Sequence, residues 1–282
     1  MEVTRLSDAL GAYVSGVDLG NVDAGAADKI REAFYEHQIL LFRGQDISME
    51  QHIAFSKNFG PLEVHISKDS LHDDHEEILL VSNKKENGAY IGVENAGDSW
   101  HSDLSYMPEP SLGSLLYALE VSEIGGDTEW LNMYDAYDTL PEETKQRIDG
   151  LKARHSFNRY KNNRISVPSQ RQEGGKERYE KLSPPDVFHP VARTHPETGR
   201  KALYVSPRFT LGILDGSEDE AQDLLDELIE HATQRKFVYH HEWKVGDLVM
   251  WDNRCVMHYA VHDYGDAPRE MHRVTVAGER PR

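Results

Sequence analysis

The sequence predicts a mainly β protein with flanking helices, built as a double-sheet barrel. Its apolar residues fall mostly in short runs bounded by Gly, Asp, Asn or Pro, which is typical of strands. Helical patterns are few and do not alternate regularly with these runs, which disfavours a parallel doubly wound sheet. Two stacked sheets with helices at their flanks accommodate this pattern better.

Three segments have the pattern of a helix. Residues 26–37 carry apolar side chains at helical spacing, and Asp23 precedes them as a candidate N-cap. Ser48 and Gln51 form a capping-box pattern ahead of a second apolar run. The longest predicted helix, residues 218–234, has one continuous apolar stripe. Its expected cap and capping-box residues are Ser217 and Glu220.

Strand patterns are more numerous than helical ones. Each is a short apolar segment that ends at turn-forming residues. The predicted strands are residues 38–42, 78–82, 115–119, 128–131, 202–205, 237–240, 248–251 and 274–276.

Composition excludes several classes of protein. The 282 residues carry 49 acidic and 31 basic side chains, a formal net charge of −18, which disfavours binding to a nucleic-acid backbone. The single cysteine, Cys255, excludes an internal disulfide and a zinc site of several thiolates. Neither a signal peptide nor a membrane span is evident, so we expect one cytoplasmic domain over residues 1–282 with no membrane partner. Both a monomer and a homo-oligomer are compatible with this composition.

Two long polar segments interrupt the strand pattern and are predicted to act as lids. They lie near residues 65–99, around the strand at 78–82, and near residues 158–187. The second holds seven basic and four acidic residues, a net charge of +3 in a chain of −18. Long connections without regular structure commonly cover binding sites, although a disordered connection is the alternative.

The histidines suggest a metal site. A His-x-Asp or His-x-Glu pair presents two ligands on the same side of an extended segment, because side chains at i and i+2 point the same way. Together with one more histidine, such a pair can bind iron and leave one face of the metal open for oxygen and substrate. The pairs in this chain are His72/Asp74, His75/Glu77, His101/Asp103, His195/Glu197 and His240/Glu242.

Context separates these pairs. Residues 72–77 form a charge-dense run that we expect to be a solvated loop, and His195 lies in a turn sequence. His240 ends a predicted strand, and its pair stays a candidate on sequence alone. The pair formed by His101 and Asp103 is favoured because aromatic residues flank a core of small residues there, which could rim a dry pocket. The alternative is a partly buried histidine that pairs only with its neighbouring carboxylate.

A hairpin near the C-terminus could supply the third ligand. Residues 246–259 combine a strand, a polar turn and a second strand that carries His258. The alternative is a core histidine satisfied by hydrogen bonds. Farther along, Arg269 and Arg273 share one face of a strand. Arginines inside a barrel need anionic partners, which could be structural carboxylates such as Asp263 or two anionic ligands.

These motifs occur in the order and spacing of a known enzyme family. Over nearly its whole length the chain resembles the iron(II)- and 2-oxoglutarate-dependent dioxygenases of the taurine dioxygenase and 2,4-dichlorophenoxyacetate dioxygenase family. Residues 94–99 depart from the taurine-type run, which has an asparagine where Gly97 stands. The matching segments are 41–45, 59–62, 100–103, 125–130, 193–201, 251–254, His258, 263–264 and 271–273.

The resemblance implies a double-stranded β-helix, that is, a cupin-like jelly roll. It also implies an enzyme that hydroxylates a carbon of a small organic anion, a sulfonate or an aryloxy or alkyl carboxylate. Fe(II), 2-oxoglutarate and O2 would take part, and succinate and CO2 would be formed. By position, the metal-binding and catalytic residues would be His101, Asp103 and His258, and the 2-oxoglutarate carboxylate would bind Thr128 and Arg269. The expected substrate contacts are His65, Tyr106, Phe209 and Arg273.

Two other functions remain open at this point. A zinc-type metallohydrolase also uses two histidines and a carboxylate, but it needs a separate general base and has no use for Thr128 and Arg269. A jelly-roll module that binds without turnover would be favoured by the loss of one ligand, and all three candidates are present. The motifs therefore favour the dioxygenase without identifying its substrate.

Overall fold

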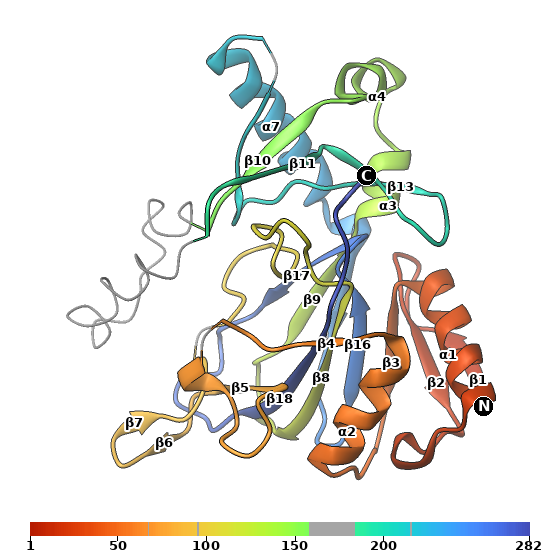
Figure 1. Ribbon diagram of the computed structural model, residues 1–282, viewed down its shortest axis with the longest axis vertical. Coiled ribbons are helices and arrows are strands. Elements are labelled where there is room, and N and C mark those ends of the chain that lie inside the picture. The colour runs from red at the N-terminus through yellow and green to blue at the C-terminus, as the bar shows by residue number, and fades with distance from the viewer. Residues whose placement is uncertain (67, 95, 158–183, 215) are drawn as a thin grey trace.

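The largest sheet has eight strands and runs through the centre of the molecule (Figure 1). Its order is β1-β2-β3-β16-β8-β18-β4, and β5 also pairs with β18. The pairings given are antiparallel, except that β2 and β3 are parallel. The strands are β1 (Glu2–Arg5), β2 (Ala12–Ser15), β3 (Ile39–Phe42), β4 (Leu62–Glu63), β5 (Ile78–Ser82), β8 (Gly113–Glu120), β16 (Leu248–Asp252) and β18 (Glu270–Val276).

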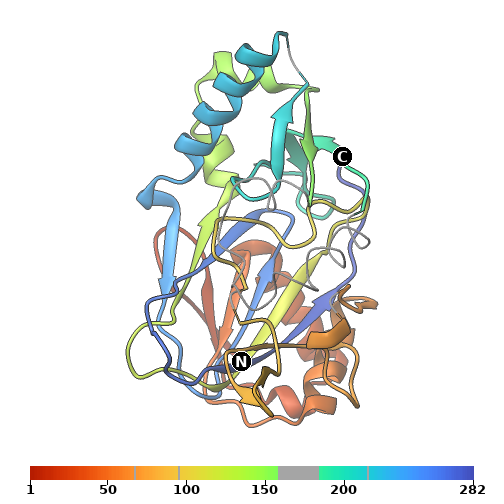
Figure 2. The same ribbon diagram turned by 90° about the vertical axis from the view of Figure 1, so that its left-hand side faces the viewer.

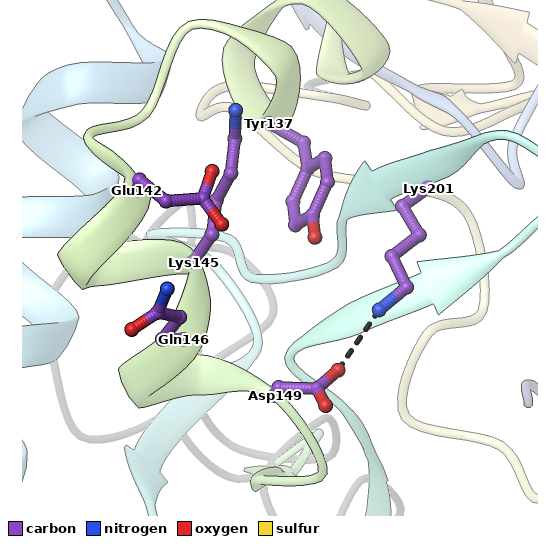
Figure 3. Close-up of a pocket in the computed structure, with 6 residues that line it drawn as sticks. All are labelled: Tyr137, Glu142, Lys145, Gln146, Asp149 and Lys201. Carbon is purple, nitrogen blue, oxygen red and sulfur yellow. Dashed lines mark hydrogen bonds and ion pairs between the residues drawn. The ribbon is translucent and has the colours of Figure 1, made fainter.

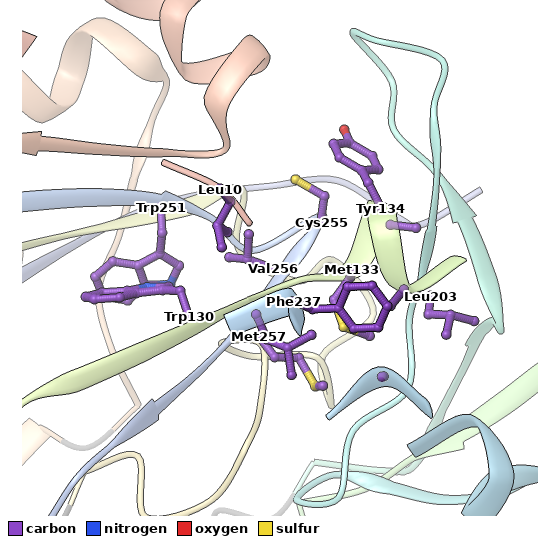
Figure 4. Close-up of a cluster of buried hydrophobic side chains, with 14 of the residues drawn as sticks. Leu10, Trp130, Met133, Tyr134, Leu203, Phe237, Trp251, Cys255, Val256 and Met257 are labelled. Atoms are coloured by element: carbon purple, nitrogen blue, oxygen red, sulfur yellow. The ribbon is translucent and has the colours of Figure 1, made fainter. Parts of the chain in front are cut away.

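A second sheet, of order β15-β9-β17, packs against one face of the first. The Trp130 and Trp251 rings meet between the two sheets, with centroids 5.7 Å apart (Figure 4). Smaller sheets pair β10 with β11 and β14, β12 with β13, and β6 with β7. The bounds are β6 (Lys85–Glu86), β7 (Ala89–Tyr90), β9 (Thr128–Asn132), β10 (Lys152–His155), β11 (Val187–Pro190), β12 (Ala192–Thr194), β13 (Lys201–Leu203), β14 (Thr210–Ile213), β15 (Val238–His241) and β17 (Val256–Ala260).

Helices flank the sheets, as Figure 2 shows from the side. The three predicted caps are confirmed: Asp23 accepts from the Ala26 backbone N–H, and complete capping boxes open α2 and α7. Short 3-10 turns occur at Leu19–Asn21, Lys57–Phe59, Lys68–Ser70 and Arg235–Phe237. The helices are α1 (Ala24–His37), α2 (Met49–Ser56), α3 (Met133–Asp138), α4 (Glu142–Ile148) and α7 (Glu218–Ala232).

Both faces of the main sheet are buried, which explains why its strands are apolar without alternation. On β3, Ile39 and Leu41 join the core between the two sheets. Leu40 and Phe42 point to the other face, where they pack with residues of α1 and α2 such as Phe34. Successive side chains of a strand point to opposite faces, so one continuous apolar run supplies two cores.

The observed elements confirm the predicted mainly β class with few helices. The structure describes residues 1–66, 68–94, 96–157, 184–214 and 216–282, so nearly all of the second predicted lid lies outside the described residues. Gln38 was expected to begin a strand, but with φ of 63° it caps α1 through a backbone bond to the Phe34 carbonyl. No helix in the described part of the chain is long and apolar enough to cross a membrane.

Acidification is expected to destabilise this fold through buried histidines. Burial lowers the pKa of His155 and of His52 to about 3. The unfolded chain protonates these rings below about pH 6.5, and the folded chain does not until about pH 3. Between those values, the free energy of unfolding should therefore fall by about 1.4 kcal/mol per pH unit for each such histidine. Urea unfolding at a series of pH values between these limits measures this slope.

A pair of variants tests this assignment. His155→Gln should reduce the loss of stability on acidification, because glutamine does not titrate. His240→Ala is the control and should leave the slope between these limits unchanged. Burial lowers the pKa of His240, but hydrogen bonds with Glu129 and Asp127 outweigh it and raise the pKa overall, so the stabilisation from its protonation is already complete below about pH 6.5. An unchanged slope in His155→Gln would show that this ring is not held neutral in the folded state.

Candidate active site

Backbone pairing brings the two candidate histidines together. His101 N–H donates to the His258 carbonyl over 3.1 Å, and His258 N–H donates back to the His101 carbonyl over 2.8 Å. The two imidazole centroids are 4.1 Å apart. The loop with the His-x-Asp pair is thereby joined to β17, the second strand of the predicted hairpin.

Asp103 completes a group of three possible metal ligands. Its Oδ1 lies 3.7 Å from Nε2 of His101 and 3.9 Å from Nε2 of His258. One donor atom from each of the three residues lies within 4.8 Å of the others, and all three side chains are buried. This arrangement provides two nitrogen donors and one oxygen donor at one point, which fits a divalent iron ion.

Hydrogen bonding and burial set the protonation states of these ligands. The His101 Nδ1 lies 2.8 Å from the Ser99 carbonyl, which can only accept, so Nδ1 carries the proton and Nε2 keeps its lone pair. Burial lowers the pKa of His101 far below its ordinary value and that of His258 to about 4. Burial alone would raise the pKa of Asp103, but the Arg273 guanidinium and both imidazoles hold it well below its usual range. The site therefore offers two neutral imidazoles and one carboxylate.

Asp103 is held by residues that sequence reasoning did not identify. The Ser114 hydroxyl donates to its Oδ2 over 2.8 Å, which leaves Oδ1 facing the imidazoles. The Asp103 N–H donates to Asn253 Oδ1 over 3.2 Å. The Asn253 amide in turn donates to the hydroxyls of Ser111 and Ser114. Asn253 lies in residues 251–254, one of the segments that resemble the dioxygenase family. This motif could therefore have identified Asn253 from the sequence.

Arg208 anchors the loop before His101. Arg208 pairs with Asp98, and its Nη1 lies 3.4 Å from the Ser99 hydroxyl. The backbone of Gly97 has φ of +80°, which disfavours a side chain. A Cβ there would also lie 3.4 Å from the Cε1 of His101. These contacts position the Ser99 carbonyl that fixes the His101 ring.

A second group of three ligand-type side chains has a structural role. Asp252 accepts two side-chain bonds from Arg254, at 2.8 and 2.7 Å, and lies 3.0 Å from Nε2 of His195. Burial raises the pKa of Cys255 well above its ordinary value, so the thiol stays protonated. His195 does lie in the predicted turn, but its side chain is buried against Asp252. The carboxylate is already neutralised, which disfavours a metal at this place.

The competing pair at His240 is not assembled as a metal site. The His240 Nε2 lies 2.8 Å from Asp127, and its Nδ1 lies 3.2 Å from Glu129. Glu242 is exposed. Both ring nitrogens are thus occupied by the carboxylates of Glu129 in β9 and of Asp127 just before it, and the His240/Glu242 prediction loses its support.

Arg269 has the surroundings of an anion-binding residue. Its side chain is buried, and burial lowers its pKa. Within the described residues its Nε has no hydrogen-bond partner. Gly126 packs beside it, since a Cβ there would lie 3.6 Å from the Arg269 Cδ. Thr128 follows at the start of β9, and its oxygen accepts from the Trp243 indole over 2.9 Å, which leaves its hydroxyl hydrogen free to donate.

Arg273 contacts the metal-ligand group itself. Its Nη1 donates to Asp103 Oδ1 over 3.0 Å. The alternative partner considered above, Asp263, is wrong, because that carboxylate instead accepts from the Gly126 N–H. Burial and Arg273 lower the pKa of His65 to about 4, so the two predicted substrate contacts share one region. Glu63, which sequence reasoning missed, lies in the same electrostatic surroundings, and burial followed by Asp103 raises its pKa.

The predicted aromatic contacts also meet beside the ligands. The ring centroids of Tyr106 and Phe209 are 4.8 Å apart, and Phe209 lies 5.8 Å from the His101 ring. Phe157 packs against Tyr106 at 4.9 Å. Tyr106 and Phe209 are buried and form an apolar wall beside the His101 ring. Burial raises the pKa of Tyr106 far above its ordinary value, so its phenol remains neutral.

A surface hollow of 430 Å³ beside α4 and β13 is unrelated to this chemistry (Figure 3). Its lining is polar, and Lys201 pairs with Asp149 over 2.8 Å across it. Lys145 and Lys201 also lie 5.7 and 5.9 Å from the Tyr137 ring. The described lining contains none of the predicted site residues.

The sequence also matches a known family. Residues 2–275 match the model for the taurine catabolism dioxygenase TauD, TfdA family. The chain belongs to this TauD/TfdA family. Membership confirms the predicted resemblance and makes the chain an alpha-ketoglutarate-dependent dioxygenase. Alpha-ketoglutarate is another name for 2-oxoglutarate.

Individual TauD/TfdA relatives align over almost the full length. The (S)-phenoxypropionate/alpha-ketoglutarate-dioxygenase of Sphingobium herbicidovorans is 33% identical over 288 residues, covering 99% of this chain and 95% of the relative. The alpha-ketoglutarate-dependent 2,4-dichlorophenoxyacetate dioxygenase of a Burkholderia species is 38% identical over 256 residues, 86% and 83% of the two chains. The crystal structure of AAD-2 with Mn(II) and N-oxalylglycine has 37% identity and a TM-score of 0.83, covering 99% of each chain.

Proposed function

We propose that this dioxygenase hydroxylates a carbon of a small organic anion, with Fe(II) at His101, Asp103 and His258. The carrying observation is the convergence of one buried carboxylate and two buried imidazoles within 4.8 Å, with the buried Arg273 guanidinium in contact with the carboxylate. Iron bound there would couple oxygen activation to the decarboxylation of 2-oxoglutarate, leaving succinate and CO2. A zinc-type hydrolase does not need a buried guanidinium beside its metal ligands. A non-catalytic module needs neither the guanidinium nor the three ligands.

The chain prepares its metal ligands in advance. The Ser99 carbonyl fixes the tautomer of His101, and the Ser114 hydroxyl holds one oxygen of Asp103 so that the other faces the imidazoles. Both contacts are buried, so they require little reorganisation when a metal binds. The aromatic wall of Tyr106 and Phe209 keeps bulk water from the ligands and positions the substrate carbon.

Arg269 and Thr128 would receive the distal carboxylate of 2-oxoglutarate. Arg269 is buried and lacks a carboxylate partner among the ion pairs of the described chain. A guanidinium in such surroundings is stabilised by a bound carboxylate, which it can hold with two parallel hydrogen bonds. Thr128 can donate its hydroxyl hydrogen to the same group.

Arg273 and His65 would receive the anionic group of the primary substrate. Arg273 uses Nη1 for Asp103, while its buried Nε lacks a partner in the described structure. A guanidinium has five donors, so it can hold Asp103 and a substrate carboxylate together. The phenoxypropionate and dichlorophenoxyacetate substrates named for two relatives are aryloxy carboxylates, and we propose this class first, followed by sulfonates and sulfate esters.

The test is a substrate panel with protein reconstituted anaerobically with Fe(II) and 2-oxoglutarate. Aryloxyalkanoates, sulfonates and sulfate esters are compared with neutral and cationic analogues of the same shape. Succinate formed above the uncoupled background is expected only with the anions. A best substrate without an anionic group would overturn the proposed class, and hydrolysis without succinate would favour the zinc-type alternative.

Arg273→Leu is expected to lose most substrate-stimulated succinate formation. Leucine keeps the apolar volume of the side-chain stem but removes the cation that would meet the substrate anion. Calorimetry should show that the variant still binds 2-oxoglutarate, because Arg269 is untouched. The matched control is Arg43→Leu, which removes a guanidinium paired with Asp247 at another place. Full stimulated turnover in Arg273→Leu would move substrate recognition elsewhere.

The double-stranded β-helix, the single domain and the lid near residues 65–99 are also part of the proposal. The two facing sheets would form a double-stranded β-helix, and residues 1–282 would act as one domain. The polar segment near residues 65–99 contributes His65 to the site and contains β5, so only its flanking parts could move as a lid. The cytoplasmic location and the homo-oligomer stay predictions from the sequence.

A further inference from the structure

We propose a second transition-metal site, of the Zn(II) type, on the outer face of β18. Four histidines that the candidate active site does not use gather there: His52 of α2, His72 and His75 of the loop before β5, and His272 of β18. A pocket of 360 Å³ is lined by His52, His75 and His272 together with Glu50 and Glu270. Imidazole and carboxylate are suitable ligands for zinc.

Two histidine–carboxylate pairs already have a suitable spacing. The His75 Nε2 lies 3.3 Å from Glu50 Oε1, and the His272 Nε2 lies 3.5 Å from Glu270 Oε1. Two donors bound tetrahedrally to zinc at about 2.1 Å lie about 3.4 Å apart. The Lys84 ammonium holds the other oxygen of Glu270 at 2.7 Å, which leaves Oε1 directed to His272.

His52 brings a third imidazole to the same pocket. Its side chain is 1% exposed, and burial lowers its pKa to about 3 in spite of a contact with the Leu115 backbone, so the ring is neutral. A neutral imidazole is the form that binds a metal. It lines the pocket together with His75 and His272.

The donors of this second site do not yet surround one point, so a shared ion would have to draw them together. The described groups of three donors within 4.8 Å of one another do not include these histidines. His75 lies in the loop at residues 72–77, so a shared ion would draw this loop toward β18. The sequence predicted a solvated loop, but His72 and His75 are both half-buried, and His75 lines the pocket. A bound ion would tie the segment that follows His65 to the strand whose opposite face carries Arg273.

Zinc stoichiometry tests this site without reference to turnover. Equilibrium dialysis of the full chain against Zn(II) is expected to show two bound equivalents, one at each site. His101→Ala should lose one, and His75→Ala/Glu50→Ala should lose the other. Both residues of the double variant lie at the surface end of the pocket, so folding should be preserved, as circular dichroism can check. His37→Ala and His240→Ala are histidine controls outside both groups.

The outcomes distinguish this site from the candidate active site. Loss of one equivalent in His75→Ala/Glu50→Ala, with the His101 equivalent retained, supports the second site. X-ray absorption of zinc-loaded His101→Ala should then show nitrogen and oxygen donors. One equivalent in the unmodified chain, or two in His75→Ala/Glu50→Ala, would overturn the proposal. A chain that binds zinc at the second site but forms no succinate would contradict the proposed function alone.

Discussion

Asp103→Ala is expected to abolish metal binding and succinate formation. Asp103 is the sole anion of the three-ligand group, and its Oδ1 is the atom that faces both imidazoles. The substitution also leaves Arg273 buried without its 3.0 Å partner, which should cost about 3–5 kcal/mol of unfolding free energy. Calorimetric titration with Fe(II) under anaerobic conditions and urea unfolding measure the two effects separately.

Further variants distinguish the loss of the Asp103 charge from a loss of folded protein. Asp103→Asn keeps the size of the side chain, so loss of iron binding in this variant would be due to charge rather than unfolding. Asp103→Ala/Arg273→Leu should recover part of the lost stability, because the unpaired guanidinium is also removed. His240→Ala should bind iron normally. Full turnover in Asp103→Ala, with no added ligand to replace the carboxylate, would refute the ligand assignment.

Arg269→Lys is expected to raise the KM for 2-oxoglutarate. A lysine keeps the charge but cannot make the two parallel hydrogen bonds of a guanidinium to a carboxylate. Loss of one charge-assisted hydrogen bond costs about 1.5–3 kcal/mol, which corresponds to an increase of about 10- to 100-fold. Steady-state kinetics with 2-oxoglutarate and the primary substrate varied in turn measure the two KM values.

The KM for the primary substrate is the control for the effect of Arg269→Lys on the KM for 2-oxoglutarate. The KM for the primary substrate should change much less, because Arg273 and His65 remain. The Thr128→Val variant should raise the KM for 2-oxoglutarate more modestly, since it removes one neutral donor that also accepts from Trp243. An unchanged KM for 2-oxoglutarate in Arg269→Lys would transfer the role to another arginine, with Arg273 as the first candidate.

Local patterns were sufficient for much of the fold. The capping boxes at Ser48 and Ser217 were identified correctly because a capping box involves residues only three positions apart. The strand at residues 78–82 was located to the residue, since its apolar run is bounded by polar residues. By contrast, β1, exposed along its whole length, has no apolar pattern that could reveal it. The short strands β10, β11 and β14 also escaped prediction.

The sequence by itself determined the mainly β class, the family and the residues that could bind a metal. Motif spacing also singled out Arg269 and Arg273 as interior cations. Only the tertiary structure decided that Arg273 pairs with Asp103, 170 positions away, and that Asn253 holds the same residue across 150 positions. It also showed that His240 pairs with the carboxylates of Asp127 and Glu129 instead of binding a metal with Glu242. The physical reason is that such partners are set by strand register and sheet packing, which depend on the whole chain and leave no local pattern.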